Sequence, residues 1–192
     1  MKLDNTKTKE NLLKAFAGES QARNRYTYFA SVAKKEGYPV IAAIFEETAN
    51  HEKEHAKRFF KFLEGADMLE ITASFPAGKI GTTLENLVAS AAGEHEEWSD
   101  MYPEFAKVAR EEGFDTIAEA FENVAKAETY HEERYNKLIE DLNKQGLFKK
   151  AGLVVWKCTN CGYHVTAESA PLVCPACNHP QSYFVELNEK LY

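Results

Sequence analysis

Glu-Lys-Glu-His at residues 52–55 decides the fold of this 192-residue chain, together with Glu-Thr-Tyr-His at residues 128–131. In each stretch a glutamate stands three residues before a histidine, and on a helix such residues lie on the same face. Each stretch therefore offers one carboxylate and one imidazole to the same point in space. This combination of donors suits iron, manganese or zinc. The second stretch follows the first at an offset of 76 residues, which indicates an internal repeat.

The repeat extends well beyond these two stretches, as the pairs Gly37 and Gly113, and Phe45 and Phe121, show at the same offset. Ala-Gly-Glu at residues 17–19 recurs at residues 92–94, which is an offset of 75. One residue has therefore been inserted into the second copy after Glu94. The insertion predicts a locally widened helical turn. An unbroken ladder of i to i−4 hydrogen bonds over residues 94–105 would refute it.

Composition and charge exclude several classes of function. The hydrophobic fraction of 44% supports a real core, and the formal net charge of −7 argues against nucleic acid or an anionic membrane as a partner. No apolar run approaches the length of a membrane span, and residues 1–7 lack the apolar segment of a secretory signal. We therefore expect a cytoplasmic protein that binds neither membrane nor nucleic acid.

Hydrophobic spacing and stop signals predict four long helices. Their expected ranges are 7–36, Pro39 to about 64, Thr82 to Gly113, and Asp115 to about 144. Gly37 and Gly113 are typical residues for the end of a helix. Thr82 and Glu85 have the spacing of a capping box, and Asp115 is expected to cap the fourth helix.

Residues 65–81 connect the second and third predicted helices. Fully extended, they reach roughly 56 Å at about 3.3 Å per residue. A helix of about 26 residues spans roughly 39 Å, so the connection can cross the whole length of a bundle. Two helical hairpins joined by one such crossover predict a mainly α protein, a ferritin-like four-helix bundle with one long crossover.

Seven residues are candidate metal ligands in this bundle. The glutamates among them lie roughly 22 to 28 Å along their helices from the turns at Gly37 and Gly113, which places them at one level. Six of the seven match the general di-iron pattern, a glutamate from each of two helices and Glu-x-x-His from each of the other two. Buried carboxylates are costly without cations, so two divalent metals are expected. The candidates are Glu19, Glu52, His55, Glu94, Glu97, Glu128 and His131.

Two further stretches carry a family resemblance. Residues 15–26, Ala-Phe-Ala-Gly-Glu-Ser-Gln-Ala-Arg-Asn-Arg-Tyr, and residues 89–97, Ala-Ser-Ala-Ala-Gly-Glu-His-Glu-Glu, resemble the rubrerythrins. The resemblance covers essentially the whole chain. It implies that Glu52 and Glu128 bridge two non-haem irons and that His131 ligates one of them. The terminal ligands that it implies are Glu19 and Glu94.

The resemblance also singles out Glu97, because the first copy of the repeat has Ala22 at the matching position. It implies that one iron exchanges Glu97 for His55 as it is reduced, which makes these two the candidate catalytic residues. Tyr26 and Tyr102 lie about two turns beyond Glu19 and Glu94 and could donate hydrogen bonds to ligand carboxylates. The alternative is that both are core tyrosines whose hydroxyls are satisfied elsewhere.

Residues 51–55 also match the His-Glu-x-x-His pattern of zinc proteases. That interpretation leaves the second Glu-x-x-His stretch unexplained, since Ala127 stands where His51 has its counterpart. We therefore expect His51 and His95 to lie at the surface or just outside the ligands.

The four cysteines form two Cys-x-x-Cys pairs near the end of the chain: Cys158, Cys161, Cys174 and Cys177. Two such pairs predict a tetrahedral site of four thiolates, and the geometry alone suits zinc or a single iron. The surrounding sequence resembles rubredoxin knuckles, which favours iron. We expect a bundle at residues 1–146, a linker at 147–152 and a small rubredoxin-like domain with one iron at 153–192.

The resemblance implies a peroxidase of the NADH peroxidase type, an oxidoreductase that reduces hydrogen peroxide to water and protects against oxidative stress. Electrons would come from NAD(P)H through a separate protein, rubredoxin or its reductase, and reach the di-iron site through the cysteine-bound iron. It also implies homodimers in which the tail of one subunit serves the bundle of its neighbour, head to tail. The alternatives are a ferroxidase or iron-storage protein, and an interaction module with a zinc ribbon.

Overall fold

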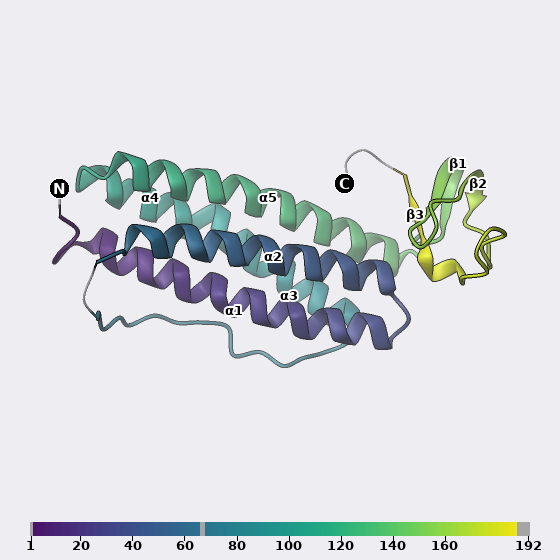
Figure 1. Cartoon of the computed structure of the whole chain (residues 1–192), viewed down its shortest axis with the longest axis horizontal. Coiled ribbons are helices and arrows are strands. Elements are labelled where there is room, and N and C mark those ends of the chain that lie inside the picture. Colours follow the sequence, from purple (N-terminus) through teal and green to yellow (C-terminus); the bar gives the residue numbers. More distant parts are fainter. Residues whose placement is uncertain (1, 66–67, 188–192) are drawn as a thin grey trace.

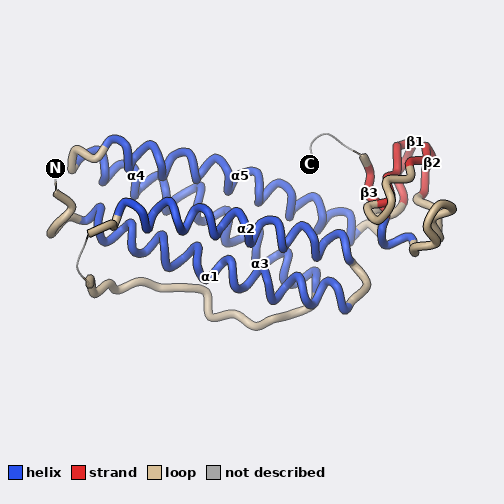
Figure 2. Tube along the Cα trace, viewed as in Figure 1, coloured by secondary structure: helices blue, strands red, loops and turns tan. Residues whose placement is uncertain are grey.

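The computed structural model describes residues 2–65 and 68–187, and four long helical rods form its larger part (Figures 1 and 2). The rods are α1 (Lys7–Lys35), α2 (Pro39–Phe62), α3 (Thr83–Glu96) continued by the π-helical turn η1 (Glu97–Met101) and α4 (Tyr102–Glu111), and α5 (Asp115–Asn143). The connection from α2 to α3 runs along the outside of the bundle beside α1 (Figure 1). The predicted ferritin-like bundle with one crossover is confirmed.

Both hairpin turns use a glycine with a left-handed backbone, Gly37 with φ of 86° and Gly113 with φ of 81°. The predicted capping box of Thr82 and Glu85 is present at the start of α3. The expected cap at Asp115 is wrong, because Phe114 occupies the N-cap position and makes no side-chain cap. Phe114 donates its N–H to the carbonyl of Ala109 at 2.7 Å and packs against the core, which leaves Asp115 as the first helical residue.

The residue inserted into the second copy of the repeat produces the π-helical turn η1. The backbone N–H of Tyr102 donates to the carbonyl of Glu97, five residues back instead of four. The predicted widened turn is therefore confirmed, and it begins at a candidate ligand. Such turns are rare in helices and are often found at functional sites.

The two helical hairpins cap each other. Glu36, at the turn of the first hairpin, accepts from the backbone N–H of Thr83 at 2.9 Å, at the start of α3. Glu112, at the turn of the second, accepts from the backbone N–H groups of Lys7 and Thr8 at 3.0 and 2.8 Å, at the start of α1. A carboxylate is favourable at both positions, because the N-terminus of a helix carries partial positive charge. The repeat in sequence is thus a repeat in structure.

Two apolar clusters lie on either side of the acidic level of the bundle. One is centred on the fully buried rings of Phe45 and Tyr135 and the other on Phe59, Tyr102 and Phe121. Aromatic rings within each cluster lie 5.0 to 6.4 Å apart between centroids, the range in which tilted and edge-on pairs are favourable. The carboxylates between the clusters are therefore shielded from water along the bundle axis.

A three-stranded antiparallel sheet in the order β2-β1-β3 follows the bundle. Its strands are β1 (Lys149–Cys158), β2 (His164–Ser169) and β3 (Phe184–Glu186), with a 3-10 turn, η2 (Gln181–Tyr183), before β3. Strand β1 begins inside the segment expected to be a linker, residues 147–152. Leu147 packs on the bundle and Phe148 on the core of the small domain, so the first two residues of this segment are packed. Residues 188–192 of the expected second domain lie outside the described residues.

Candidate metal centres

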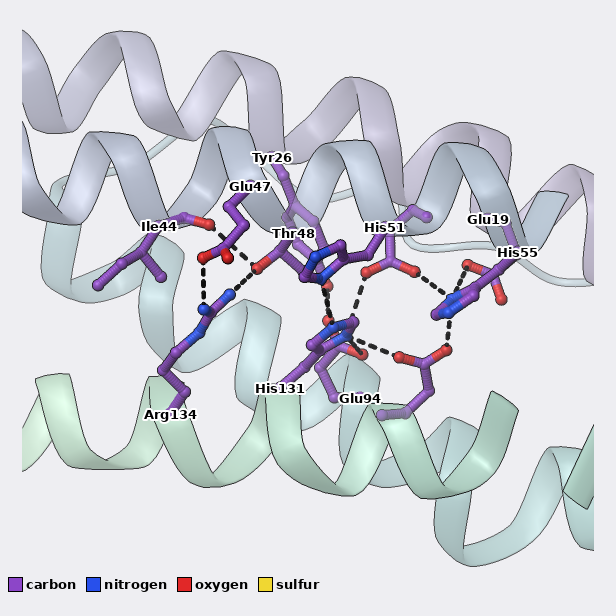
Figure 3. A network of polar contacts seen from close by, with 12 residues as sticks. Glu19, Tyr26, Ile44, Glu47, Thr48, His51, His55, Glu94, His131 and Arg134 are labelled. Atoms are coloured by element: carbon purple, nitrogen blue, oxygen red, sulfur yellow. Dashed lines mark hydrogen bonds and ion pairs between the residues drawn. The ribbon is translucent and has the colours of Figure 1, made fainter. Parts of the chain in front are cut away.

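Six of the seven predicted ligands converge midway along the bundle (Figure 3). Each helical rod contributes to them. Glu19 comes from α1, Glu52 and His55 from α2, Glu94 from α3, and Glu128 and His131 from α5. The four glutamates are at most 1% exposed. As predicted, the glutamate and the histidine of each Glu-x-x-His stretch lie on the same face of their helix and point toward one centre.

The donors form two overlapping groups. Within each group, one donor atom from every residue lies within 4.8 Å of the others. Glu52 and Glu128 belong to both groups, so each can hold two ions at once. The groups are Glu19, Glu52, His55 and Glu128, and Glu52, Glu94, Glu128 and His131.

The two histidines point the same ring nitrogen at these carboxylates. Nδ1 of His55 lies 3.0 Å from an oxygen of Glu52 and 3.0 Å from one of Glu128. Nδ1 of His131 lies 2.7 Å from the other oxygen of Glu128 and 3.2 Å from the other oxygen of Glu52. Each shared carboxylate thus turns one oxygen toward each histidine, which is the arrangement of a bridging ligand.

The chemistry of this donor set fits two divalent cations. Within the described residues, one buried oxygen each of Glu19, Glu52 and Glu94, and both oxygens of Glu128, have no hydrogen-bond partner. Burial raises the pKa of Glu94 to about 8, and burial with the charge of Glu52 raises the pKa of Glu19 well above its usual range. Burial lowers the pKa of His131, but Glu128 and Glu52 outweigh it and raise that pKa to about 12. Burying these carboxylates in their charged form is unfavourable without positive charge nearby, and a pair of metal ions supplies that charge.

Glu97 lies outside both groups. It is the first residue of the π-turn and is half-buried. Burial raises its pKa well above the usual value, and the charges of Glu19 and Glu94 raise it further. It therefore lies within electrostatic reach of the centre, and its role as a ligand stays a prediction.

The two tyrosines bond to the carboxylates in a crossed pattern. The hydroxyl of Tyr26, on α1, donates to Glu94, and the hydroxyl of Tyr102, on α4, donates to Glu19. Both tyrosines are at most 3% exposed. Glu94 and Glu19 are therefore each oriented by a tyrosine from the other hairpin, which agrees with the predicted hydrogen bonds to ligand carboxylates.

Sequence reasoning missed one buried network beside the centre. The guanidinium of Arg134, 5% exposed and one turn beyond His131, donates to Glu47 at 2.6 Å and to the hydroxyl of Thr48 at 2.7 Å (Figure 3). These bonds tie α5 to α2 next to the ligands. The repeat pairs Arg134 with Arg58, which is exposed, so no signal in the sequence marks Arg134 as buried.

The four cysteine sulfurs also converge, within 4.8 Å of one another. Cys158 lies 3.7 Å from Cys177, and Cys161 lies 3.7 Å from Cys174, so each Cys-x-x-Cys turn contacts the other twice. Both turns have the same backbone pattern. Gly162, after Cys161, has a φ of 79° and donates its N–H to the carbonyl of Cys158. Asn178, after Cys177, has a φ of 61° and donates its N–H to the carbonyl of Cys174. Four thiolates so placed suit one tetrahedral metal ion.

Comparison with known families decides between the possible metals. The family model described as "Rubrerythrin" matches residues 10–139, and that of the "Rubrerythrin, rubredoxin-like domain" matches residues 156–185. The chain belongs to the rubrerythrin family. It is therefore an oxidoreductase of the di-iron family. Its carboxylate and histidine cluster is the site for two non-haem irons, and its four cysteines are the site for a third.

Relatives match along nearly the full length. A rubrerythrin of Porphyromonas gingivalis is 62% identical over 93% of this chain and 89% of its own. A rubrerythrin of Nitratidesulfovibrio vulgaris is 53% identical over 95% of each chain. Among solved structures, nigerythrin in a mixed-valence state aligns with a TM-score of 0.63 and 32% identity, over 95% of this chain and 90% of that one. No helix of the described residues is both long and apolar enough to span a membrane.

Proposed function

We propose that this rubrerythrin-family chain is a peroxidase that reduces hydrogen peroxide to water. The observation that carries the proposal is the unequal setting of the two ligand histidines. The side chain of His131 is 4% exposed, whereas that of His55 is 17% exposed and borders a hollow of about 300 Å³ between α2 and α5. A small oxidant can therefore approach the centre from the side of His55, where a ligand can also move.

The reaction consumes one hydrogen peroxide, two electrons and two protons and yields two water molecules as the O–O bond breaks. Two ferrous ions, when bound, supply the electrons, one each. The chain supplies a candidate proton donor, since burial and the charges of Glu19 and Glu94 raise the pKa of Glu97 and so favour its protonated form. We assign the exchange between Glu97 and His55 to the side of the centre that borders the hollow. Glu94 and Glu19 are less free to exchange, because Tyr26 and Tyr102 hold them by hydrogen bonds.

The cysteine-bound iron would return electrons one at a time, drawn from NAD(P)H through a separate rubredoxin or reductase. The sequence contains no Gly-x-Gly-x-x-Gly motif for binding the nucleotide itself. The sheet lies beyond one end of the bundle (Figure 1). Glu19, Glu52 and Glu128 lie near the middle of α1, α2 and α5. This separation supports a head-to-tail homodimer in which the small domain of one subunit serves the bundle of the other. The proposed location is the cytoplasm.

Stopped-flow oxidation of the reduced, iron-loaded protein tests this proposal. We expect hydrogen peroxide to oxidise the di-iron site faster than O₂ at equal concentration. A clear preference for O₂, with accumulation of ferric oxide, would instead make the chain a ferroxidase or storage protein. A purified protein without iron colour would favour an interaction module.

A further inference from the structure

The ring of His51 lies directly against a metal-ligand histidine. Its Nδ1 lies 3.1 Å from Nε2 of His131, within hydrogen-bond distance. The two rings lie edge to edge in nearly one plane, with centroids 5.3 Å apart and planes 11° from parallel, as an N–H···N hydrogen bond requires (Figure 3). His51 itself is largely exposed and reaches His131 from α2 across to α5.

The contact gives Nε2 of His131 a hydrogen-bond partner on the side away from the carboxylates. A neutral imidazole has one N–H donor and one lone-pair acceptor. If Nε2 of His131 donates to His51, its Nδ1 keeps the lone pair, and this is the atom that faces Glu128 at 2.7 Å and Glu52 at 3.2 Å. A metal ion between these carboxylates needs that lone pair. The partner on the outer nitrogen of a ligand histidine typically tunes metal affinity in this way.

The other histidine lacks such a partner at the matching position. Ala127 stands 76 residues after His51, and its methyl group cannot hydrogen bond to His55. The two Glu-x-x-His stretches therefore differ in how firmly their imidazoles are held. The π-turn η1 is a second difference between the two copies of the repeat, and it lies on a different helical rod from His51 and Ala127.

We propose that His51 is a positioning residue that holds His131 in one tautomer and one orientation, and so makes the iron at His131 the fixed member of the pair. His55 is left free to move, because Ala127 stands at the repeat position that corresponds to His51. The inference rests on the di-iron site and does not depend on which oxidant the centre consumes.

Mössbauer spectroscopy of the reduced, iron-loaded full chain tests this inference, because the two bundle irons give separate signals. We expect His51→Ala to alter one signal only and to speed chelator removal of one bundle iron by about tenfold. His51→Gln, which keeps an amide oxygen as acceptor, should restore both. The matched control is His95→Ala, since His95 bonds to Glu132 and not to a ligand.

A second variant tests the same idea in reverse. Ala127→His should alter the signal of the iron at His55 and leave the other unchanged. The inference is overturned if His51→Ala changes neither signal or both equally, or if His51→Gln behaves like His51→Ala. It is likewise overturned if Ala127→His perturbs the iron at His131. Failure of the peroxidase proposal would leave every one of these signals as expected.

Discussion

The two halves of the metal centre come from the same repeated sequence, yet they are built differently. On one side His131 is almost fully buried, lies within hydrogen-bond distance of His51 and is one turn before the buried Arg134. On the other side His55 is partly exposed and borders a hollow, and Ala127 stands at the repeat position that corresponds to His51. The repeat thus supplies two equivalent sets of donors, and the residues next to them make one set more buried than the other.

The residues shared by the halves should matter most. Glu128→Ala removes a carboxylate that belongs to both donor groups, so we expect both bundle irons to be lost and peroxide reduction to fall by about a thousandfold or more. The cysteine-bound iron should remain, because its site is separate. Metal analysis together with the visible spectrum measures both. Retention of two bundle irons would show that Glu128 does not join the halves.

Glu97 tests the asymmetry introduced by the inserted residue. Glu97→Ala should slow oxidation by peroxide about a hundredfold, because it removes the candidate proton donor. Six other ligands remain, so iron content should not change. Glu96→Ala is the matched control on the neighbouring, exposed position. Loss of iron in Glu97→Ala would contradict the role proposed here.

The metal-free protein should lose stability as pH rises from 6.5 to 8. Glu94, with a pKa of about 8, and His131, with a pKa of about 12, bind protons more tightly when folded than when unfolded. Above pH 6.5 the unfolded chain has released both protons, so the free energy of unfolding should fall by about 1 kcal/mol or more per pH unit. Denaturant titrations at several pH values measure it.

The iron-loaded protein is the control for this pH dependence. Metal ions replace the protons on the same groups, so its free energy of unfolding should not fall over this range. A metal-free protein whose stability is constant or increases with pH would show that the carboxylates are less buried than described.

The crossed tyrosines should give the smallest effect. Tyr26→Phe and Tyr102→Phe each remove one hydrogen bond to a terminal glutamate, which should lower stability by about 0.5 to 1.5 kcal/mol. Tyr26→Phe loosens Glu94, on the fixed side, and Tyr102→Phe loosens Glu19, on the side of His55. If peroxide reduction depends on motion at His55, Tyr102→Phe should change its rate more. Equal changes in rate would argue that both sides move.

Much of this architecture follows from the sequence because it depends on spacing alone. The three-residue spacing in each Glu-x-x-His stretch and the distance of each glutamate from its glycine turn place six ligands at one level. The one-residue shift in the repeat predicts the π-turn. Asp115 and Arg134 could not be predicted, since their settings depend on tertiary contacts. Phe114 displaces Asp115 from the cap by packing into the core, and Arg134 is buried although its repeat partner Arg58 is not.

The reciprocal bonds of Glu36 and Glu112 bear on how such a chain could have arisen. Each hairpin completes the first turn of the other, and neither supplies that carboxylate to its own first helix. A single ancestral hairpin would have met the same need by pairing with an identical copy of itself. Duplication and fusion of its gene would then have released the two copies from symmetry, which is the condition for one of them to gain an extra residue.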